Sequence, residues 1–332
     1  MSTSTGEKPL LRVKDISVAF PVTGRGIVRR RIGSVRAVDG VSFELRQNET
    51  LGLVGETGSG KSTTALAVLR MLDLSGGRIE FDGHDITRLG RARMRRLRRG
   101  MQMIFQDPFA SLNPRMRIGR ILEEPLVVHG LTGDGRGSAR RVDELLELVG
   151  LDSGTRDRFP HEFSGGQRQR ISIARALAVS PKLLICDEPV SALDVSIQAQ
   201  IINLLVDLKR RTGLALLFIA HDLALVRHIS DRVAVMYAGR IVELADRDAL
   251  YERPLHPYTQ ALLAAVPRPD PEVETARGIG LLPDEPPRSI DPALGCPFSL
   301  RCPKAMDVCR CETPPLRMRD ARAVACHLYG PD

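Results

Sequence analysis

A phosphate-binding loop is the feature of this sequence that most restricts its fold. The loop follows an apolar run at residues 50–54 and precedes an apolar-rich stretch at residues 63–69. The pattern G-x-x-x-x-G-K-S between a buried strand and a helix is typical of a nucleotide-binding site. With the position that follows it, the loop consists of Gly55, Glu56, Thr57, Gly58, Ser59, Gly60, Lys61, Ser62 and Thr63.

Each part of this loop has a chemical task in holding a triphosphate. The glycines let successive backbone N–H groups point at an anion, and the following helix adds the positive end of its dipole. The Lys61 ammonium reaches the β- and γ-phosphates, and the Ser62 hydroxyl is a ligand for Mg²⁺. A glycine-rich turn without a ligand is the alternative, but few such turns place Gly-Lys-Ser before a helix. The sequence therefore predicts a nucleoside triphosphate site.

The composition limits the classes of protein to which the chain can belong. Its 332 residues, of which 43% are hydrophobic, suffice for a full core and two or three subdomains. No apolar run approaches the roughly 18–20 residues that span a bilayer, and the N-terminus lacks a signal-peptide pattern. We therefore expect a cytosolic protein, in which the six cysteines need an explanation other than disulfides. The net charge of +8 permits contact with nucleic acid or anionic lipid but requires neither.

Alternating apolar residues predict β-structure on both sides of the loop. Strands are expected at residues 10–20 and 37–45, joined by a basic loop, and a hairpin at residues 76–83. Phe20, at the end of the first strand, either stacks on an adenine ring or is an ordinary strand aromatic. Residues 91–99 contain six arginines, for which a solvated helix face is the preferred interpretation and anionic lipid contact the alternative.

A glutamine ends the short apolar strand expected at residues 101–106. The amide of Gln106, at a strand end, has the chemistry to reach Mg²⁺ or an attacking water, although one glutamine alone is weak evidence. Two prolines then break regular structure at residues 107–114. Helical spacing follows at residues 118–148, interrupted at residues 130–137.

A second candidate anion site precedes the apolar-periodic helix expected at residues 171–179. A hydroxyl and unhindered backbone N–H groups at a helix N-terminus are suited to binding an anion. A simple loop and helix cap is the alternative. The residues concerned are Ser164, Gly165, Gly166 and Gln167.

Two adjacent carboxylates end the apolar strand expected at residues 182–186. Because ligands bind at the carboxyl edge of a parallel sheet, Asp187 suits a Mg²⁺ shell and Glu188 suits polarising a water. His221 ends the strand expected at residues 214–220, at the same edge, and is suited to donating to the γ-phosphate. The alternatives are solvated surface acids and a capping or core histidine.

Taken in order, these motifs resemble those of the ATP-binding subunit of an ABC transporter. They are Walker A at residues 55–62, the Q-loop Gln106, the signature from Ser164 to Gln167, Walker B with Asp187 and Glu188, the D-loop ending at Asp194 and the H-loop His221. The signature departs from the family pattern, which usually begins with leucine, because Phe163 stands there. The resemblance covers about residues 10–250. It implies an α/β P-loop NTPase fold with a parallel-sheet nucleotide core, an antiparallel β subdomain and a helical signature subdomain.

The resemblance also implies a mechanism and a set of partners. Two ATPase subunits, identical or paralogous, are expected to face each other head to tail. ATP and Mg²⁺ on one Walker A loop are then completed by Ser164 and its neighbours, and by Asp194, of the other subunit. Glu188 acts as base, with Gln106 and His221 beside it. Two integral-membrane permease subunits and an extracytoplasmic substrate-binding protein complete the assembly, at the cytoplasmic face of the membrane.

The C-terminal part is similar to that of the oligopeptide/dipeptide importer branch of this family. The similarity is carried by residues 255–263 and 295–303, while residues 111–114 and the long N-terminal loop favour the F type of a D/F pair. We therefore expect a nucleotide-binding domain at residues 1–245, with its helical subdomain at about 107–178, and an extension at residues 246–332. The expected function is ATP hydrolysis that powers peptide uptake, with the cargo left open.

Four of the five cysteines in this proline-rich extension are candidate metal ligands, since the extension lacks the apolar residues for a large core. They are Cys296, Cys302, Cys309 and Cys326. Four thiolates suit zinc or an iron–sulfur cluster, and the resemblance favours a 4Fe–4S cluster. The additional thiol of Cys311 makes the fourth ligand less certain, whereas Cys186 is expected to be a small buried hydrophobe.

Two other functions compete with transport. A soluble ABC ATPase acting on nucleic acid or the ribosome would suit the arginine-rich segments, but the chain has one cassette and no sustained heptads. We therefore expect no nucleic-acid partner. An electron-transfer role for the extension is weaker, because the sequence contains no second redox motif.

Overall fold

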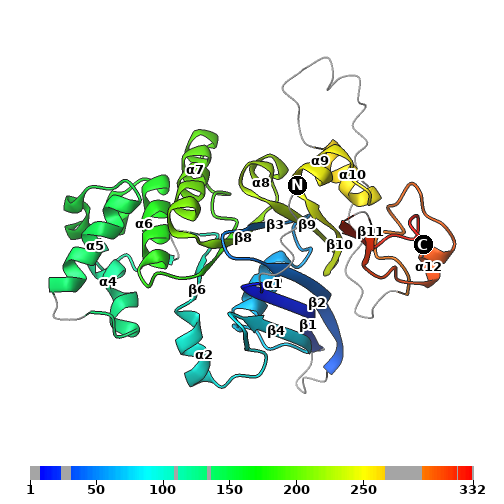
Figure 1. The fold of residues 1–332 in the computed structure, drawn as a ribbon, viewed down its shortest axis with the longest axis horizontal. Coiled ribbons are helices and arrows are strands. Elements are labelled where there is room, and N and C mark those ends of the chain that lie inside the picture. Colours follow the sequence, from blue (N-terminus) through cyan, green and yellow to red (C-terminus); the bar gives the residue numbers. More distant parts are fainter. Residues whose placement is uncertain are drawn as a thin grey trace, which may run out of the picture. The chain divides into compact units, whose positions relative to one another are not determined.

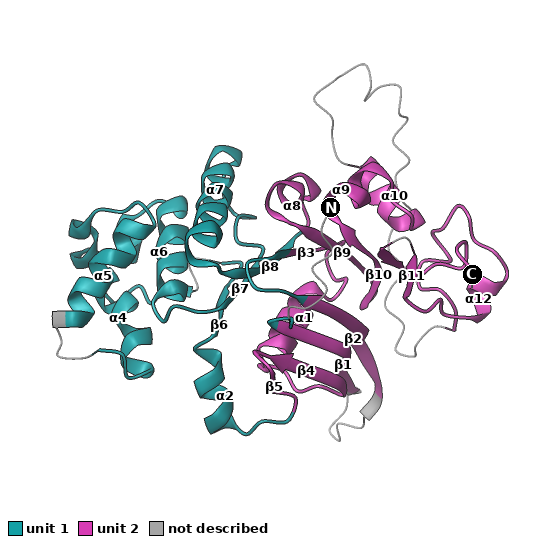
Figure 2. Ribbon diagram, viewed as in Figure 1, with its two compact units in different colours: residues 1–10, 45–50, 88–220 teal, residues 11–44, 51–87, 221–332 magenta. Residues whose placement is uncertain are grey.

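The chain folds into two compact units that each combine segments distant in sequence. A computed structural model describes residues 8–23, 31–107, 111–132, 136–265, 294–319 and 321–330. The first unit contains residues 1–10, 45–50 and 88–220, and the second contains residues 11–44, 51–87 and 221–332 (Figure 2). The predicted motifs are therefore divided between the two units, which are described in turn.

Three parallel strands form the sheet of the first unit. β7 (Leu183–Asp187) pairs on one side with β6 (Met101–Ile104) and on the other with β8 (Ala215–Ala220). Every residue of β7 and β8 is buried, which is why both strands are continuous apolar runs in the sequence. Because the three strands run in the same direction, the residues that follow β6 and β7 emerge at the same edge of the sheet.

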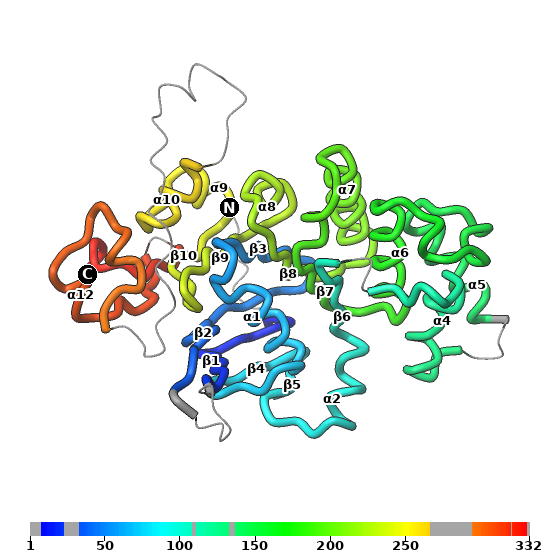
Figure 3. The backbone as a smooth tube through the Cα atoms, turned by 180° about the vertical axis from the view of Figure 1, so that it is seen from behind, coloured from blue at the N-terminus to red at the C-terminus, as the bar shows by residue number. Residues whose placement is uncertain are grey.

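Three helices of the first unit pack against one another. They are α4 (Ile118–Val128), α5 (Arg136–Leu148) and α6 (Gly165–Leu177), and views from opposite sides show them close together (Figures 1 and 3). The short turns η1 (Ser153–Asp157) and η2 (Pro160–Glu162) link α5 to α6. This arrangement agrees with the helical character expected for residues 118–148.

Two further helices of the first unit flank the strands. α2 (Arg91–Arg98) precedes β6, and of its eight residues only Met94 is buried, as expected for a solvated arginine-rich face. α7 (Val195–Thr212) follows β7 and ends at Gly213, whose φ of +68° provides a left-handed C-cap.

The second unit contains an antiparallel sheet with the strand order β2-β1-β4-β5. Its strands are β1 (Leu11–Thr23), β2 (Arg31–Leu45), β4 (Gly76–Phe81) and β5 (His84–Asp85). The expected hairpin at residues 76–83 was placed too early. Residues 76–81 form a single strand that pairs with β1, and the turn at residues 82–83 leads into β5.

A second sheet in this unit carries the phosphate-binding loop. β3 (Thr50–Val54) pairs in parallel with β9 (Arg232–Tyr237), and β9 pairs antiparallel with β10 (Arg240–Asp246). α1 (Lys61–Val68) follows β3 after the loop, and α8 (Leu223–Ile229) precedes β9. The loop is thus flanked by a fully buried strand and a helix, as the sequence predicts.

The C-terminal segment, meaning residues 294–319 and 321–330, contributes strands to this second sheet. After α9 (Arg247–Glu252) and α10 (Pro257–Ala264) come α12 (Val308–Cys311), β11 (Arg317–Arg319) and β12 (Arg322–Val324). β12 pairs antiparallel with β10, placing Val324 opposite Glu243, and β11 pairs with β12. The last strands therefore extend the sheet that supports the phosphate-binding loop.

Three expected loops fall partly outside the described residues. They are the basic loop after the first strand, without residues 24–30, the proline-containing segment, without residues 108–110, and the interruption at residues 130–137, without residues 133–135. In the part of the chain that is described, no helix has the length and apolar character needed to cross a membrane.

Candidate nucleotide-binding site

The Walker A loop depends on two glycines that no other residue can replace without a collision. Gly55 and Gly60 have φ angles of +153° and +104°. A Cβ on Gly55 would lie 2.2 Å from the Met236 carbonyl oxygen, and one on Gly60 would lie 2.3 Å from the Ala37 carbonyl oxygen. The loop is therefore packed against neighbouring backbone as well as being curled.

The Lys61 side chain folds back onto the loop that precedes it. Its ammonium donates to the carbonyl oxygens of Gly55 and Glu56, each at 2.8 Å, and the residue is only 5% exposed. The start of α1 has no side-chain cap and no acidic residue in its first turn. No carboxylate in that turn therefore offsets the positive end of the helix dipole. Ser62 is exposed and Thr63 half-buried at this turn. These features suit the predicted phosphate site.

The remaining loop residues differ in exposure. Thr57 and Gly58 are exposed, whereas Ser59 is buried, and its carbonyl oxygen accepts a hydrogen bond from the Gly239 N–H at 2.8 Å. Glu56 is half-buried and its carboxylate forms an ion pair with Arg301 of the C-terminal segment. The tip of the loop is thus open while its two ends are anchored.

Phe20 and His221 also belong to the second unit. Phe20 lies on β1 with 42% of its surface exposed, and His221 is exposed immediately before the N-cap of α8. That cap is Asp222, whose carboxylate accepts from the N–H groups of Ala224 and Leu225 at 2.7 and 3.3 Å. The neighbouring aspartate therefore performs the capping that was the alternative role for His221, and a nucleotide contact for either residue remains a prediction.

The first unit brings together two residues that the sequence only placed at separate strand ends. The Gln106 side-chain amide donates a hydrogen bond of 2.9 Å to Oε2 of Glu188. Glu188 has a φ of +47°, in the left-handed region, and its N–H donates to the Ile219 carbonyl oxygen at 2.9 Å. A non-glycine residue in this conformation carries strain of about 1–2 kcal/mol, which is common at functional sites. Asp187, one residue earlier, is 7% exposed at the end of β7.

Ser164 begins the signature helix with a reciprocal cap. Its hydroxyl accepts from the Gln167 N–H at 3.3 Å, and the Gln167 side-chain oxygen accepts from the Ser164 N–H at 3.1 Å. The capping alternative is therefore realised in this structure. Both residues are nevertheless exposed, so the cap leaves them accessible from outside.

The signature glycines allow a close approach between helices. A Cβ on Gly166 would lie 2.5 Å from Cγ2 of Ile197, and one on Gly165 would lie 3.1 Å from Cδ2 of Leu193. The D-loop and the start of α7 thus lie directly on the signature glycines. Asp194, at the N-cap of α7, is exposed and makes no side-chain cap.

The cysteines of the extension lie near one another without forming a ready-made metal site. Burial raises the pKa of the Cys296 thiol to about 11, and the charges of Cys309, Cys326 and Cys302 add to this effect. None of the six cysteines, all of which are described, forms a disulfide. Among the described residues, no three Cys, His, Asp or Glu side chains are grouped so as to hold a metal ion. The expected cluster therefore stays a prediction. Burial also raises the pKa of the Cys186 thiol, as expected for a buried hydrophobe.

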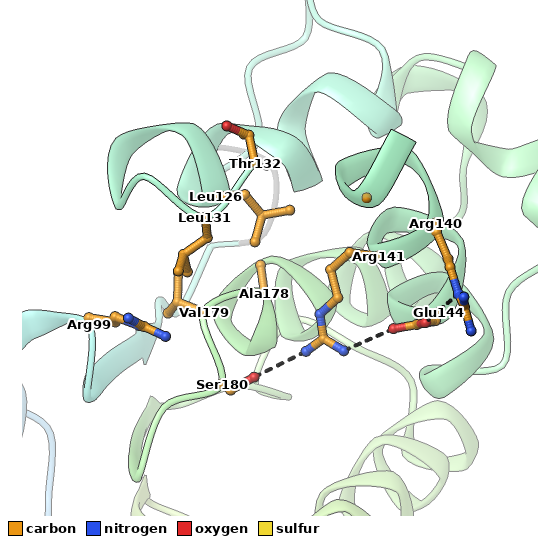
Figure 4. Close-up of a pocket in the computed structure, with 11 residues that line it drawn as sticks. Arg99, Leu126, Leu131, Thr132, Arg140, Arg141, Glu144, Ala178, Val179 and Ser180 are labelled. Carbon is orange, nitrogen blue, oxygen red and sulfur yellow. Dashed lines mark hydrogen bonds and ion pairs between the residues drawn. The ribbon is translucent and has the colours of Figure 1, made fainter. Parts of the chain in front are cut away.

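A pocket of about 350 Å³ in the first unit lies apart from every predicted site residue of that unit (Figure 4). It is lined by Arg99 at the end of α2, by residues in and just after α4, by Arg140 and Arg141 of α5, and by residues 178–180 after α6. Arg141 spans it with hydrogen bonds to Glu144 at 3.3 Å and to the Ser180 hydroxyl at 3.2 Å. Arg141 is therefore held by side chains of the pocket itself.

The sequence analysis missed the residues that fasten the Walker A loop from outside. Tyr258 and Arg301 lie in the two stretches that carried the family resemblance, but neither was given a role. An acidic residue inside a phosphate-binding loop was the available clue, since Glu56 needs a cation to offset its charge. The position of that cation, 245 residues further along the chain, is set only by the fold.

Comparison with protein families gives two matches in this chain. A family described as ABC transporter matches residues 38–191, and one described as oligopeptide/dipeptide transporter, C-terminal region, matches residues 242–309. The first matched region contains the Walker A loop, Gln106, the signature and Walker B, and the second contains Arg301 and three of the four expected cysteine ligands.

Curated relatives match over nearly the whole length. The oligopeptide transport ATP-binding protein AppF of Bacillus subtilis is 48% identical over 99% of this chain and 100% of its own. The probable peptide ABC transporter ATP-binding protein y4tS of Sinorhizobium fredii is 51% identical, over 97% of this chain and 90% of its own. A putative peptide import ATP-binding protein of Brucella abortus is 53% identical, over 98% of this chain and 95% of its own.

Solved structures agree on the fold. CbiO1 of Clostridium perfringens, part of the ABC transporter complex cbiONQ, has a TM-score of 0.64 and 27% identity, covering 74% of this chain and 92% of its own. The ATP-binding cassette MJ0796, in a post-hydrolysis state with ADP and Pi, has a TM-score of 0.63 and 24% identity over 71% of this chain and 98% of its own. The second likeness concerns the fold alone.

The fold, the Walker A loop and the paired glutamine and glutamate define an ATP-hydrolysing cassette of the ABC transporter class. Within that class, the chain belongs to the family of oligopeptide transport ATP-binding proteins, as the full-length relatives and the C-terminal match require. The predicted α/β P-loop fold and the predicted family are both confirmed.

Proposed function

We propose that this ATPase powers the uptake of peptides through a membrane-bound importer. The observation that carries the proposal is the C-terminal region, which matches the oligopeptide/dipeptide transporter family at residues 242–309. Relatives that match nearly the whole of this chain, including this region, are named for peptide or oligopeptide transport or import. The division into a cassette at residues 1–245 and an extension at residues 246–332 forms part of the proposal.

In this proposal each motif residue has a separate task. Lys61 and the loop N–H groups hold the phosphates, and Ser62, Gln106 and Asp187 hold Mg²⁺, which when bound offsets the phosphate charge. Glu188 polarises the attacking water and His221 donates to the γ-phosphate. The hydrogen bond of 2.9 Å between Gln106 and Glu188 supports a shared location for the metal-binding and base functions. Phe20 stacks on the adenine.

The proposal includes a second ATPase subunit that supplies Ser164–Gln167 and Asp194 in trans. The exposed positions of Ser164, Gln167 and Asp194 support this role, since a residue that completes a partner's site must be accessible. A head-to-tail pair is symmetric and forms two equivalent nucleotide sites.

A mixing experiment tests the shared sites. Lys61→Ala removes the phosphate contact and Ser164→Arg blocks the signature, so a pair of either variant alone should be inactive. When differently tagged copies of the two variants are mixed, each mixed pair has one intact site. A mixed pair should therefore show up to half of the ATPase rate of a wild-type pair. Failure of the mixture to recover activity, with both variants folded, would refute sharing between copies. Where the second subunit is a paralogue, each variant is paired with it in turn, and both pairs should keep one intact site.

Transport itself is tested with the assembled complex. The chain should co-purify with two permease subunits at the cytoplasmic membrane surface, and an extracytoplasmic binding protein should deliver the peptide. Proteoliposomes holding ATP inside should accumulate labelled oligopeptide, and the Glu188→Gln complex should not. Co-purification with ribosomes or nucleic acid, without peptide uptake, would favour the alternative function.

A 4Fe–4S cluster, or zinc, on Cys296, Cys302, Cys309 and Cys326 rests on the family resemblance and on the proximity of the thiols. Among the described residues, no three of these side chains are grouped closely enough to hold a metal ion. Anaerobic purification followed by iron, sulfide and zinc analysis decides the question. The expected result is a bound metal in the wild type and in Cys311→Ser, and its loss in Cys302→Ser. Metal-free protein would refute the assignment.

A further inference from the structure

The C-terminal segment grips the Walker A loop through one bidentate ion pair. Arg301 donates from Nη1 to Oε2 of Glu56 at 2.8 Å and from Nη2 to Oε1 at 2.9 Å. The Arg301 side chain is 5% exposed and that of Glu56 is 28% exposed. Two parallel hydrogen bonds between planar groups fix orientation as well as distance, and a buried guanidinium without its partner is costly.

The main chain of Glu56 is fastened to the same region. Its N–H donates to the Tyr258 hydroxyl at 3.0 Å, while Arg301 Nη1 also contacts the Tyr237 hydroxyl at 3.3 Å. Tyr258 comes from α10, so two separate segments contact Glu56 directly, and Tyr237 of β9 contacts Arg301. Glu56 is therefore held by its backbone and its side chain together.

An aromatic cluster anchors Arg301 itself. Phe298, 1% exposed, packs against Tyr237 and Tyr258 with ring centroids 5.3 and 5.4 Å away. The Arg301 guanidinium lies over the rings of Tyr237 and Phe298 at 5.7 and 5.9 Å. These contacts restrict the rotamers of Arg301. A shift of the C-terminal segment would therefore move the guanidinium and, with it, the Glu56 carboxylate.

The same loop residue contacts the phosphate-binding lysine. The Glu56 carbonyl oxygen accepts from Lys61 Nζ at 2.8 Å, so Arg301 and Lys61 hold Glu56 from its two ends. Without a cation beside it, the Glu56 carboxylate would place a negative charge in the loop that must bind phosphates. Arg301 thus orients the loop and offsets this charge.

We propose that Arg301 is a positioning residue of the nucleotide site, through which the C-terminal segment keeps the Walker A loop in its phosphate-binding shape. The C-terminal segment is then a working part of the ATP site in addition to any role toward other subunits. This inference rests on ATP binding by the Walker A loop.

Nucleotide affinity of the full-length protein tests the inference. Arg301→Met removes the charge and keeps much of the volume, and it should weaken binding of a fluorescent ATP analogue roughly tenfold because Glu56 is left uncompensated. Arg301→Lys keeps the charge and should retain most of the affinity. Adding Glu56→Gln to Arg301→Met removes the uncompensated carboxylate and should recover about half of the lost affinity on a logarithmic scale.

A matched control separates loop positioning from docking of the C-terminal segment. Arg322 is also in this segment and donates to the carbonyl oxygens of Ala249 and Arg253, without contacting the loop. Arg322→Met should bind ATP like the wild type. In ATPase assays of the assembled complex, Arg301→Met should raise KM and leave kcat nearly unchanged, since Glu188 is intact; a purely structural loss would lower the active fraction instead.

The outcomes are distinguishable. Arg301→Met with wild-type affinity, or an equal loss in Arg301→Met and the double variant, would overturn the inference. If Arg301→Met fails to fold, the double variant decides the question: the inference expects its affinity to lie about threefold below that of Arg322→Met, and an affinity equal to that of Arg322→Met would overturn it. A wild-type protein that binds no ATP would instead refute the nucleotide site itself.

Discussion

The Gln106 amide donates a hydrogen bond of 2.9 Å to the Glu188 carboxylate, joining the residues that follow two neighbouring parallel strands. The glutamine side chain is neutral, so this hydrogen bond orients the carboxylate without placing another charge beside it. Because Glu188 also stands at a φ of +47°, both its side chain and its backbone are held in a fixed arrangement. A fixed carboxylate at the carboxyl edge of the sheet suits a general base.

Replacing Glu188 by glutamine should stop turnover while ATP still binds. The amide keeps the size and the hydrogen-bonding position but cannot accept a proton, so kcat should fall by about 10²–10⁴-fold. Steady-state ATPase rates and the binding of a fluorescent ATP analogue measure the two effects. Glu144→Gln, at an exposed carboxylate on α5, is the control and should keep the wild-type rate. A Glu188→Gln enzyme with wild-type turnover would remove this residue from the mechanism.

Gly60→Ala should abolish ATP binding and lower stability. The added Cβ meets the Ala37 carbonyl oxygen at 2.3 Å, and the φ of +104° is unfavourable for alanine. We expect a loss of about 1–3 kcal/mol in the free energy of unfolding, followed by urea denaturation.

Gly83→Ala provides the matched control for this change. Its φ of +76° imposes similar backbone strain, but nothing lies within 4 Å of the added Cβ. Gly83→Ala should therefore lose some stability and keep ATP affinity. Equal loss of affinity in both variants would mean that a general loss of stability, and not the collision between residue 60 and Ala37, weakens ATP binding.

Gly166→Ala should impair the signature helix through its packing against α7. The added Cβ would lie 2.5 Å from Cγ2 of Ile197, and overpacking of this kind costs about 1–3 kcal/mol. Ile197→Ala removes that methyl group, so the double variant should recover stability relative to Gly166→Ala. Thermal melting checks this, and a double variant no more stable than the single one would contradict the contact as the cause.

The protein should lose stability as the pH falls below neutrality because of His256. Burial lowers its pKa to about 4 from 6.5, so below pH 6.5 the unfolded state binds a proton that the folded state does not. Between pH 7 and pH 5 this amounts to about 2 kcal/mol of unfolding free energy.

His256→Asn serves as the reference for this effect. The ring nitrogen of His256 accepts from the Tyr258 N–H at 3.0 Å as the N-cap of α10, and asparagine is an equally good N-cap without a titration in this range. Urea denaturation at the two pH values should show a smaller pH effect in the variant. The same pH effect in both proteins would assign it to other groups.

Much of the nucleotide site is determined locally, and the sequence therefore predicts it well. The glycines and Lys61 work through backbone conformation and helix position, so their spacing is sufficient to identify the loop. The buried strands before Asp187 and His221 are continuous apolar runs, which makes the ends of the strands visible in the sequence. The hairpin expected at residues 76–83 was placed too early because Gly76 and Gly77 lie within β4, so that the turn comes at residues 82–83, before β5.

What only the tertiary structure decided is the set of contacts between residues distant in the chain. No spacing rule connects Glu56 to Arg301, or Gly166 to Ile197, because side-chain packing and charge pairing depend on where separate segments meet. The C-terminal segment shows this most clearly. Its strand pairing, its aromatic packing and its buried ion pair with Glu56 could not be predicted from the sequence. The backbone conformation of a loop depends on consecutive residues and can be predicted from them. Contacts between residues distant in the chain form only when the chain folds.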